Sequence, residues 1–464
     1  MAESLTLLSL PVETMRQSVQ EGTTRSLAWR LEQLGRLEQL LGEVEADLME
    51  ALAHDLGKPP LEAYYELVGV REELTFTRRH LKRWMAGHSL RLPPWIWPAR
   101  ARVCPEPLGC VLIVGPWNYP FQLCLQPLIS ALAAGNTVVL KPSEFAPRTA
   151  SLIANRLAQF FPTPIVQVVQ GDGQVGAQVL EHRFDHIFFT GGGRVGRLVM
   201  AAAARHLTPV TLELGGKSPA IVLDDAQIPT TARRLVWGKG LNAGQTCVAP
   251  DHVLVVPEVR GPLLEAMAVE IARLYGPDPI TSPDLGRVVT PLHFDRLASL
   301  LSRAADQGQV LLGGRMNRDE RRIEPTVLRV DDPDNDPLMQ EEVFGPLLPV
   351  VTVPDLEAAI VRVRAAPKPL ALYLFGKRSQ DRERLRLSTS SGSLVFNDVV
   401  IQVGAPQLPL GGVGESGIGA YHGMTGFLTF SHQRTILEQR FWPDIAFRYP
   451  PYAGKLPLLK RLLG

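Results

Sequence analysis

The chain has 464 residues, which is long enough for two or three domains with sizeable hydrophobic cores. Its charge is nearly balanced, with 48 Lys and Arg against 47 Asp and Glu. No long run of one sign occurs, which argues against a nucleic-acid-binding arm and favours a small molecule as the partner.

Helical and then β-rich patterns follow each other along the chain. Apolar residues recur every three or four positions from Leu27 to Leu52, the period of a helix with one buried face. A Pro- and Trp-rich stretch at 92–98 ends this helical region. Beyond it, short β-rich runs alternate with helical segments, which predicts a doubly wound parallel sheet of the α/β class.

The strands of this sheet can be placed from their apolar runs. We expect helices between them, beginning near Phe121, Pro147, Gln174 and Arg194. Ligands of such sheets bind beyond the carboxyl ends of the strands. The predicted strands are Cys110–Val114, Thr137–Leu140, Ile165–Val169, His186–Phe189 and Val210–Leu214.

Two Gly-x-Gly-x-x-Gly patterns, at 171–176 and 191–196, each follow a predicted strand and open a helix. Free N–H groups at such a helix start favour phosphate, although a tight turn without a ligand is an equally good interpretation of either one. In the second pattern, Glu213 lies 22 residues after Gly191, the usual spacing of an acid that binds a ribose.

Glu213 has a competing interpretation as a catalytic base. Cys247 follows it by 34 residues, and a thiol becomes a strong nucleophile when its pKa falls or when a base takes its proton. A buried inert cysteine and a salt-bridged surface glutamate are the structural alternatives. Generic motif spacing does not separate these interpretations.

The other cysteines, Cys104, Cys110 and Cys124, show no C-x-x-C spacing and no histidine-rich neighbourhood, so we expect no metal site and a reducing, cytoplasmic setting. The N-terminus lacks the basic region of a signal peptide, and no apolar run reaches the roughly 18 residues of a membrane span.

A dense set of motifs makes the chain resemble the aldehyde dehydrogenase superfamily over roughly residues 16–455. The shared stretches are Asp55–Pro59, Pro116–Pro120, Lys141–Glu144, Phe189–Gly191, Leu212–Pro219, Gly244–Pro250, Glu341–Pro346, Phe396–Asp398 and Gly411–Gly417. Three further stretches resemble its class 3 branch of fatty, medium-chain and aromatic aldehyde dehydrogenases: Gly419–Gly423, Phe430–Arg434 and Arg448–Tyr452.

The resemblance implies an aldehyde dehydrogenase fold in three parts. It places a Rossmann-like dinucleotide-binding domain at 1–88 and 110–213 and an α/β catalytic domain at 214–412. A small β oligomerisation arm follows at 89–109 and 413–440, with a C-terminal tail at 441–464. Class 3 members are typically dimers, so we expect a homodimer.

The resemblance also assigns catalytic roles. Cys247 matches the nucleophile that attacks the aldehyde carbon, and Glu213 matches the base that activates the hydrolytic water. Asn118 matches the amide that faces the oxyanion, although an asparagine before Pro120 is also a common helix cap. An acylating reductase shares the fold and the cysteine but usually lacks this glutamate. A non-enzymatic protein on this scaffold would be expected to lack the cysteine.

Cofactor contacts follow in the same way, for NAD or NADP. Lys141 and Glu144 match the contacts to the first ribose, which leaves Glu213 free for catalysis; a solvated charged loop is their alternative. The second ribose and the nicotinamide match Glu342 and Phe344. The remaining predicted cofactor residues are Trp117, Gly191, Gly192 and Gly196, and Gly192 stands where many relatives carry Ser or Asn. An acid near the 2′-OH favours NAD and leaves NADP open.

The positions that match the substrate tunnel carry Tyr119, Trp237 and Leu241, which favours an apolar aldehyde over a charged one. Core packing is the alternative for Trp237 and Leu241. Gly240 replaces the usual bulky residue, so we expect a wider wall near Cys247. The leucine- and lysine-containing segment 455–464 is expected to be a solvated or dimer-packed tail, and weak membrane association is the alternative.

Overall fold

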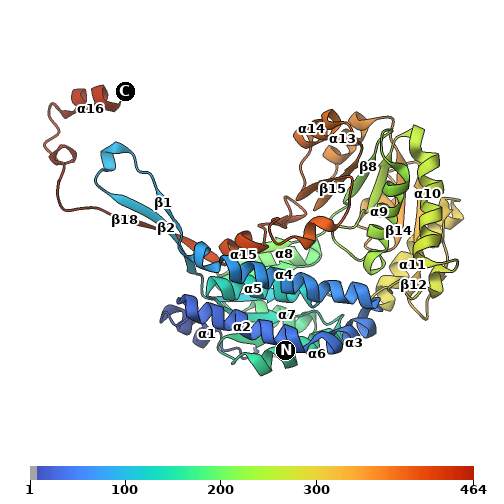
Figure 1. Ribbon diagram of the computed structural model, residues 1–464, viewed down its shortest axis with the longest axis horizontal. Coiled ribbons are helices and arrows are strands. Elements are labelled where there is room, and N and C mark those ends of the chain that lie inside the picture. Colours follow the sequence, from blue (N-terminus) through green and yellow to red (C-terminus); the bar gives the residue numbers. More distant parts are fainter. Residues whose placement is uncertain (1–7, 464) are drawn as a thin grey trace, which may run out of the picture.

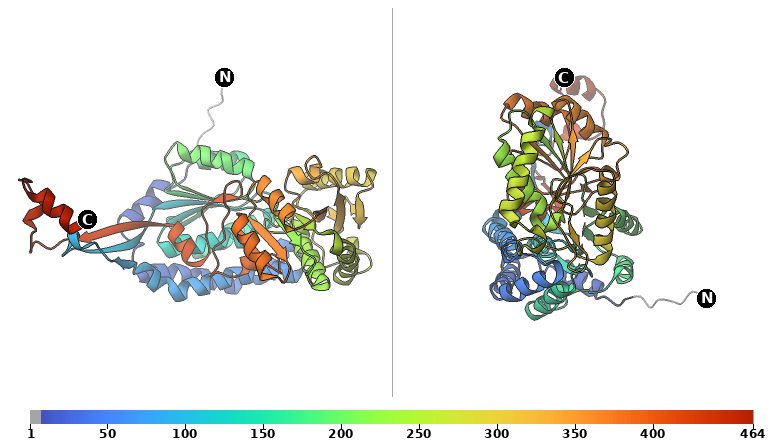
Figure 2. Two further views of the ribbon diagram at one scale, coloured as in Figure 1. Left: turned by 90° about the horizontal axis from the view of Figure 1, so that it is seen from above. Right: turned by 90° about the vertical axis from the view of Figure 1, so that its right-hand side faces the viewer.

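The computed structural model describes residues 8–463, which form two lobes and a protruding arm (Figure 1). Each lobe is built around one mainly parallel sheet. The arm carries the C-terminal helix α16 (Lys455–Leu463) beyond its tip, and Figure 2 shows it extending away from both lobes. Among the described residues, no helix is both long enough and apolar enough to cross a bilayer.

The six-stranded sheet of the first lobe has the order β17-β7-β6-β3-β4-β5. The sequence-based strand assignments are confirmed to within one residue at each end. The strands are β3 (Cys110–Val114), β4 (Thr137–Lys141), β5 (Val166–Val168), β6 (His186–Thr190), β7 (Val210–Glu213) and β17 (Gly417–Ile418).

Helices cover both faces of this sheet because alternate residues of each strand point to opposite sides. In β3, Val111 and Ile113 pack with one set of helices, whereas Cys110 and Leu112 pack with the other. The first set is α2 (Leu27–Glu43), α3 (Glu45–Leu56), α4 (Pro60–Met85), α5 (Gln122–Ala134), α6 (Pro147–Phe160) and α15 (Gly423–Thr429). The second set is α1 (Val12–Gln20), α7 (Gly173–Leu180) and α8 (Gly193–Ala204).

The strand order reverses at β3, because β4 lies on one side of it and β6 on the other. Crevices for ligands form at the carboxyl ends of strands at such a reversal. The chain leaves β3 at Val114 and runs directly into the segment Pro116–Pro120. The topology therefore places Trp117, Asn118 and Tyr119 at the expected ligand crevice.

The segment Asp55–Pro59 joins three helices. Gly57 ends α3 in the left-handed region, at φ 60°. The Asp55 carboxylate accepts hydrogen bonds from the N–H groups of Arg148 and Thr149 and so caps the start of α6. Pro59 and Pro60 then begin α4, where a missing N–H costs nothing. The residues of this family motif are therefore also explained by the structure, because they end α3, cap α6 and begin α4.

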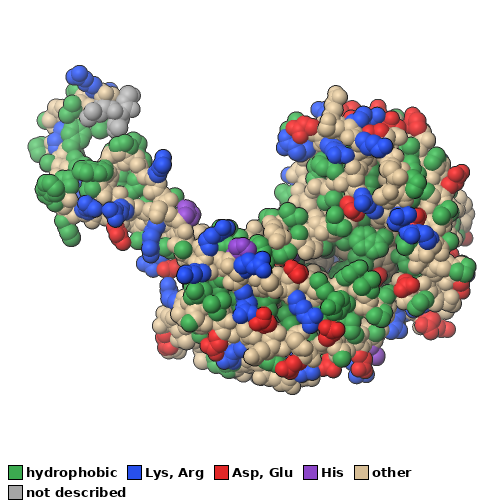
Figure 3. Space-filling view, viewed as in Figure 1, with side chains coloured by type: hydrophobic (Ala, Val, Ile, Leu, Met, Phe, Trp, Pro, Cys, Tyr) green, Lys and Arg blue, Asp and Glu red, His purple; other side chains and the backbone are tan. Residues whose placement is uncertain are grey.

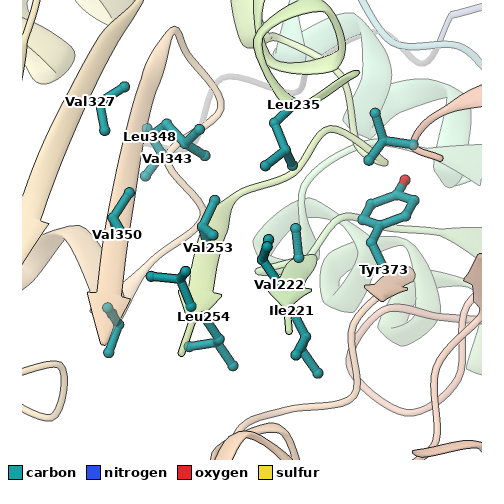
Figure 4. Close-up of a cluster of buried hydrophobic side chains, with 14 of the residues drawn as sticks. Ile221, Val222, Leu235, Val253, Leu254, Val327, Val343, Leu348, Val350 and Tyr373 are labelled. Carbon is teal, nitrogen blue, oxygen red and sulfur yellow. The ribbon is translucent and has the colours of Figure 1, made fainter. Parts of the chain in front are cut away.

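The second lobe contains a seven-stranded sheet in the order β10-β13-β14-β9-β8-β15-β16. Aliphatic side chains from its strands and from α9 form the largest buried cluster (Figure 4). Its strands are β8 (Pro219–Val222), β9 (His252–Val255), β10 (Val310–Leu312), β13 (Thr326–Val330), β14 (Leu347–Thr352), β15 (Ala371–Phe375) and β16 (Ser393–Phe396). Its helices are α9 (Ile228–Gly240), α10 (Pro257–Tyr275), α11 (Pro291–Asp306), α12 (Pro337–Gln340), α13 (Leu356–Ala365) and α14 (Ser379–Ser388), and β11 (Met316–Asn317) pairs with β12 (Arg322–Ile323).

The arm is a three-stranded antiparallel sheet of β1 (His88–Leu90), β2 (Arg100–Pro107) and β18 (Ser431–Glu438). The expected domain boundaries stay a prediction. Within the stretch 413–440 assigned to the arm, β17 pairs with β7 and α15 packs on α5, so these residues lie against the first lobe. Only β18 from this stretch pairs with the arm strands.

Candidate active site

Cys247 lies on a sharply turned loop that follows α9. The three residues Asn242, Ala243 and Gly244 all have left-handed backbones, with φ values of 52°, 52° and 75°. A Cβ at Gly244 would lie 2.2 Å from the carbonyl oxygen of Gly345, so this position requires glycine. We call residues 241–247 the nucleophile turn. Non-glycine residues rarely adopt this conformation, so surrounding contacts must hold the turn in place.

Asn118 is one of the residues that hold the turn. Its side-chain amide donates to the carbonyl oxygen of Gln245 at 3.0 Å, and its own carbonyl oxygen accepts from the Asn242 side chain at 2.9 Å. The alternative role of Asn118 as a helix cap is wrong, because α5 begins at Gln122 and its first N–H groups donate to Glu66. The fold thus brings the Asn118 side chain into contact with Gln245, which precedes Cys247 by two positions.

Glu213 is the last residue of β7 and is 4 % exposed. Neither carboxylate oxygen has a hydrogen-bond partner among the described residues. Burial raises the pKa of Glu213 well above its usual value of 4.5, because a charged carboxylate is poorly solvated there. Burial, with further contributions from Glu342 and Glu213, also raises the pKa of the Cys247 thiol to about 12. In this conformation, burial therefore favours the protonated form of both groups.

These shifts predict the pH dependence of the enzyme. A glutamate acts as a base only when it is ionised, and a raised pKa keeps it protonated over a range of pH above 4.5. We therefore expect kcat to rise as the pH increases through that range, because a growing fraction of Glu213 is ionised. The measurement is a pH profile of kcat for the wild type and for Glu213→Gln, whose residual rate should lack this ionisation. A wild-type kcat that is flat with pH would contradict the prediction.

Cys247 opens onto a cavity of about 280 Å³ between the two lobes. Tyr119, Trp237 and Leu241, the expected substrate residues, line the same cavity. Leu241 and Trp237 also pack with the hydrophobic core of the second lobe, so the core-packing alternative holds beside their position in the cavity wall. The remaining wall contains residues that the sequence did not single out for substrate contact, among them Glu62, Tyr65, Gln122, Val400, Ile401, Tyr421 and His422.

The expected widening of the wall at Gly240 is wrong. A Cβ at this position would lie 1.7 Å from the hydroxyl oxygen of Tyr275. Gly240 is therefore needed because the Tyr275 side chain, which comes from the end of α10, fills the adjacent space. The missing side chain makes room for a tyrosine, and Gly240 does not line the cavity that contains Cys247.

The two glycine-rich turns differ in whether their helix starts are free. At α7, the Asp172 side chain accepts hydrogen bonds from the N–H groups of Gln174 and Val175, so this start already carries a carboxylate. At α8, Gly192 is the capping residue and no side chain caps the helix. A Cβ at Gly192 would meet no atom within 4 Å. The α8 start therefore has both the free donors and the open space that a phosphate needs.

This difference predicts the effect of an added carboxylate at α8. Gly192→Asp would give α8 a capping carboxylate like the one that Asp172 provides at α7. This carboxylate would accept from the N–H groups at the start of the helix, and its charge would repel the cofactor phosphates. We expect the KM for NAD(P) to rise roughly tenfold or more, whereas the unfolding temperature stays unchanged or rises because the helix gains a cap. An unchanged cofactor KM would show that the phosphates bind elsewhere.

The other expected cofactor residues lie beside these turns and across the cleft. Lys141, at the end of β4, is 5 % exposed, and its Nζ lies 3.4 Å from an oxygen of Glu144, so Lys141 is not part of a solvated loop. Close packing also explains why glycine is found at positions 191 and 196. A Cβ at Gly191 would lie 2.6 Å from the Phe189 ring, and one at Gly196 would lie 2.9 Å from Leu214.

Residues of the second lobe complete the cleft. A Cβ at Gly215 would lie 2.1 Å from Glu342, so the Glu342 carboxylate lies close to the segment that follows Glu213. Phe344 meets Trp117 edge-on, with 5.3 Å between the ring centroids. His293 also packs against Trp117, at 5.2 Å. His293 could not be singled out from the sequence, because it is not part of any ligand-like pattern on α11.

Comparisons with known proteins agree with this arrangement. A family model described as "Aldehyde dehydrogenase family" matches residues 11–436. The chain is 44% identical over 455 residues to "Aldehyde dehydrogenase family 3 member H1" of Arabidopsis thaliana, covering 97% of this chain and 94% of the relative. It is 42% identical to "Aldehyde dehydrogenase, dimeric NADP-preferring" of Rattus norvegicus, covering 97% and 99%.

A solved structure described as the substrate-bound state of Staphylococcus aureus AldH is similar in fold. It superposes with a TM-score of 0.94 at 39% identity, covering 97% of this chain and 98% of that one. The fold and the cleft therefore define an oxidoreductase that uses NAD or NADP. The chain belongs to the aldehyde dehydrogenase family, and the expected aldehyde dehydrogenase fold and class 3 resemblance are confirmed.

Proposed function

We propose that this enzyme oxidises apolar aldehydes, either aliphatic aldehydes of medium to long chain or aromatic ones, to carboxylic acids. The observation that carries this proposal is the wall of the cavity at Cys247. It is built largely from aromatic and aliphatic side chains, and none of the described residues that line it is Lys or Arg. An alkyl chain or ring gains from burial there, whereas a negatively charged semialdehyde finds no cation to pair with.

In the first half of the reaction, the Cys247 sulfur attacks the carbonyl carbon and a thiohemiacetal forms. Because burial raises the pKa of the thiol to about 12, its proton passes to solvent as the C–S bond forms, and the former carbonyl oxygen takes up the negative charge. The Asn118 amide and the Cys247 N–H stabilise the developing oxyanion, and Asn118 is already anchored next to this loop through Gln245. A nicotinamide held beside Phe344 and Trp117 would supply the hydride acceptor for the thiohemiacetal carbon, and Cys247 would then carry the acyl group as a thioester.

In the second half, Glu213 takes a proton from water, and the resulting hydroxide attacks the thioester carbonyl. The C–S bond then breaks and the proton on Glu213 passes to the leaving sulfur, which releases the carboxylic acid and restores the thiol and the carboxylate. The unpaired carboxylate oxygens of Glu213 support this role, because they are free to accept from a water molecule. A hydrolytic glutamate also favours this reaction over transfer of the acyl group to coenzyme A.

For the cofactor, we propose that Lys141, Glu144 and Glu342 hold the riboses, that Phe344 and Trp117 border the nicotinamide, and that the turn at Gly191, Gly192 and Gly196 receives the diphosphate. We expect NAD to be preferred because Glu144 repels a 2′-phosphate. Use of NADP as well remains part of the proposal, since the rat relative is named for its NADP preference.

We also propose a cytoplasmic homodimer that pairs through the arm. Hydrophobic side chains gather on the arm and tail (Figure 3), and Trp95, Trp97 and Trp442 are 62%, 60% and 82% exposed. Exposed aromatic groups of this kind usually mark a contact surface. A second copy of the chain is the proposed partner, and weak association of the tail with membranes is the alternative.

The substrate proposal is tested by a kinetic panel. Linear aldehydes from butanal to hexadecanal, benzaldehyde and succinic semialdehyde are compared with each cofactor, with products analysed in the presence and absence of coenzyme A. We expect kcat/KM to rise with chain length, the semialdehyde to be the poorest substrate, and the free acid to be the product. A preference for the semialdehyde, or a product that requires coenzyme A, would refute the proposal.

A further inference from the structure

One face of helix α4 contacts both loops of the active site. Glu62 and Glu66 lie near its start, one helical turn apart, so their side chains leave the same side, and Lys58 lies two residues before the helix begins. We call these three residues the α4 clamp. Lys58 lies within the motif Asp55–Pro59 and Glu62 also lines the cavity at Cys247, but none of the three takes part in a chemical step described above.

Glu66 holds the loop that carries Asn118. Its Oε2 accepts hydrogen bonds from the N–H groups of Phe121 and Gln122, both at 3.0 Å. No side chain of α5 itself caps that helix, so Glu66 supplies the cap from another element. The segment Pro116–Pro120 ends immediately before these two residues, and its direction is therefore fixed by Glu66.

Lys58 ties Glu66 to Tyr119. Its Nζ lies 2.6 Å from Glu66 Oε1 and 3.8 Å from the centre of the Tyr119 ring, and both charged side chains are completely buried. The Tyr119 hydroxyl in turn is 2.7 Å from the Thr246 hydroxyl, one residue before Cys247. A buried cation with one carboxylate and one aromatic face leaves little freedom for the ring.

Glu62 holds the nucleophile turn directly. Its Oε2 accepts the N–H of Asn242 at 2.8 Å, and Asn242 is the first left-handed residue of that turn. The same asparagine donates from its side chain to Asn118 and Gln245. Glu62 therefore fixes the backbone at the point where the chain departs from an ordinary conformation.

We propose that Lys58, Glu62 and Glu66 are positioning residues that set the distance between the Asn118 amide and the Cys247 sulfur. Glu66 and Lys58 place the loop of Asn118, and Glu62 places the turn of Cys247; the two glutamates belong to α4, and Lys58 lies just before it. This inference rests on the proposed roles of Cys247 and Asn118. It goes beyond them because it assigns the geometry of the pair to contacts outside the reacting groups.

Two substitutions of Glu62 separate the effect of its side-chain length from the effect of its charge. Glu62→Gln keeps the length and an oxygen acceptor for the Asn242 N–H but removes the charge. Glu62→Asp keeps the charge but is one methylene too short for the 2.8 Å hydrogen bond. Glu50→Asp, at an exposed position on α3, is the matched control for the chemical change.

We expect Glu62→Asp to lower kcat by roughly tenfold to a hundredfold, because a displacement of about 1 Å at a reacting group can cost on the order of 10² in rate. The KM for the aldehyde should change less than kcat. Glu62→Gln should lower kcat less than Glu62→Asp does, because it keeps the hydrogen bond to Asn242, and Glu50→Asp should resemble the wild type. This pattern in kcat would distinguish positioning from a general loss of stability, which thermal unfolding of each variant measures separately.

Alkylation of Cys247 by iodoacetamide, located by peptide mass spectrometry, gives a readout that needs no aldehyde. Its rate should depart further from the wild-type rate in Glu62→Asp than in Glu62→Gln. The inference is overturned if Glu62→Asp is as active as the wild type, or if Glu62→Gln is the more impaired variant. Failure of the proposed function would appear differently, as turnover that persists when Cys247 itself is replaced.

Discussion

Replacement of Cys247 by alanine is expected to lower kcat at least about 10⁴-fold, since removal of a covalent nucleophile typically has effects of this size. The cavity, the cofactor cleft and the Asn118 loop should persist, because the Cys247 side chain is partly exposed to the cavity and supports little of the core. The measurement is steady-state formation of NAD(P)H, together with cofactor binding by fluorescence.

Cys104→Ala is the matched control. This thiol is also partly exposed, but it lies on β2 of the arm, away from the cleft. We expect this variant to keep wild-type turnover, while Cys247→Ala still binds the cofactor. Turnover in Cys247→Ala within about tenfold of the wild type would mean that another group attacks the aldehyde.

Replacement of Glu213 by glutamine is expected to separate the two halves of the reaction. Hydride transfer should still occur, so a burst of about one NAD(P)H per active site should appear. The steady-state rate should then fall by 10²–10⁴-fold, the usual contribution of a well-placed general base. Glutamine is close in size to glutamate, and its amide replaces a carboxylate that has no hydrogen-bond partner among the described residues.

A rapid-mixing experiment with a medium-chain aldehyde measures both phases. If Glu213 instead deprotonated Cys247 before attack, the burst itself would slow in proportion to the steady state, and no thioester would accumulate. An unaltered steady-state rate would remove Glu213 from the mechanism.

The first sheet could be predicted closely from the sequence. Strands such as Cys110–Val114 are short apolar runs bounded by turns, and buried parallel strands have this composition for local reasons. The motif at Gly244–Pro250 coincides with the sharply turned loop that carries Cys247. Its local pattern is tied to a backbone that only a few residue types can adopt, as the left-handed φ of Gly244 shows.

Features that depend on contacts between distant residues could not be predicted. Gly240 gave no sign that its missing side chain makes room for Tyr275, 35 positions later. The two glycine-rich turns looked alike until the cap from Asp172 was seen on one of them. The hydrogen bond between Glu62 and Asn242 joins residues that are 180 positions apart in the sequence. Each of these contacts is set by packing in three dimensions, which local sequence patterns do not encode.

The most direct test of the account is the mass of the peptide that contains Cys247, taken from Glu213→Gln after mixing with NAD(P) and a medium-chain aldehyde. We predict that this peptide gains the mass of the acyl group, with close to one adduct per chain, and that hydroxylamine releases it as expected of a thioester. An unmodified Cys247 peptide after a full burst of NAD(P)H, or an acyl group on another residue, would contradict the account.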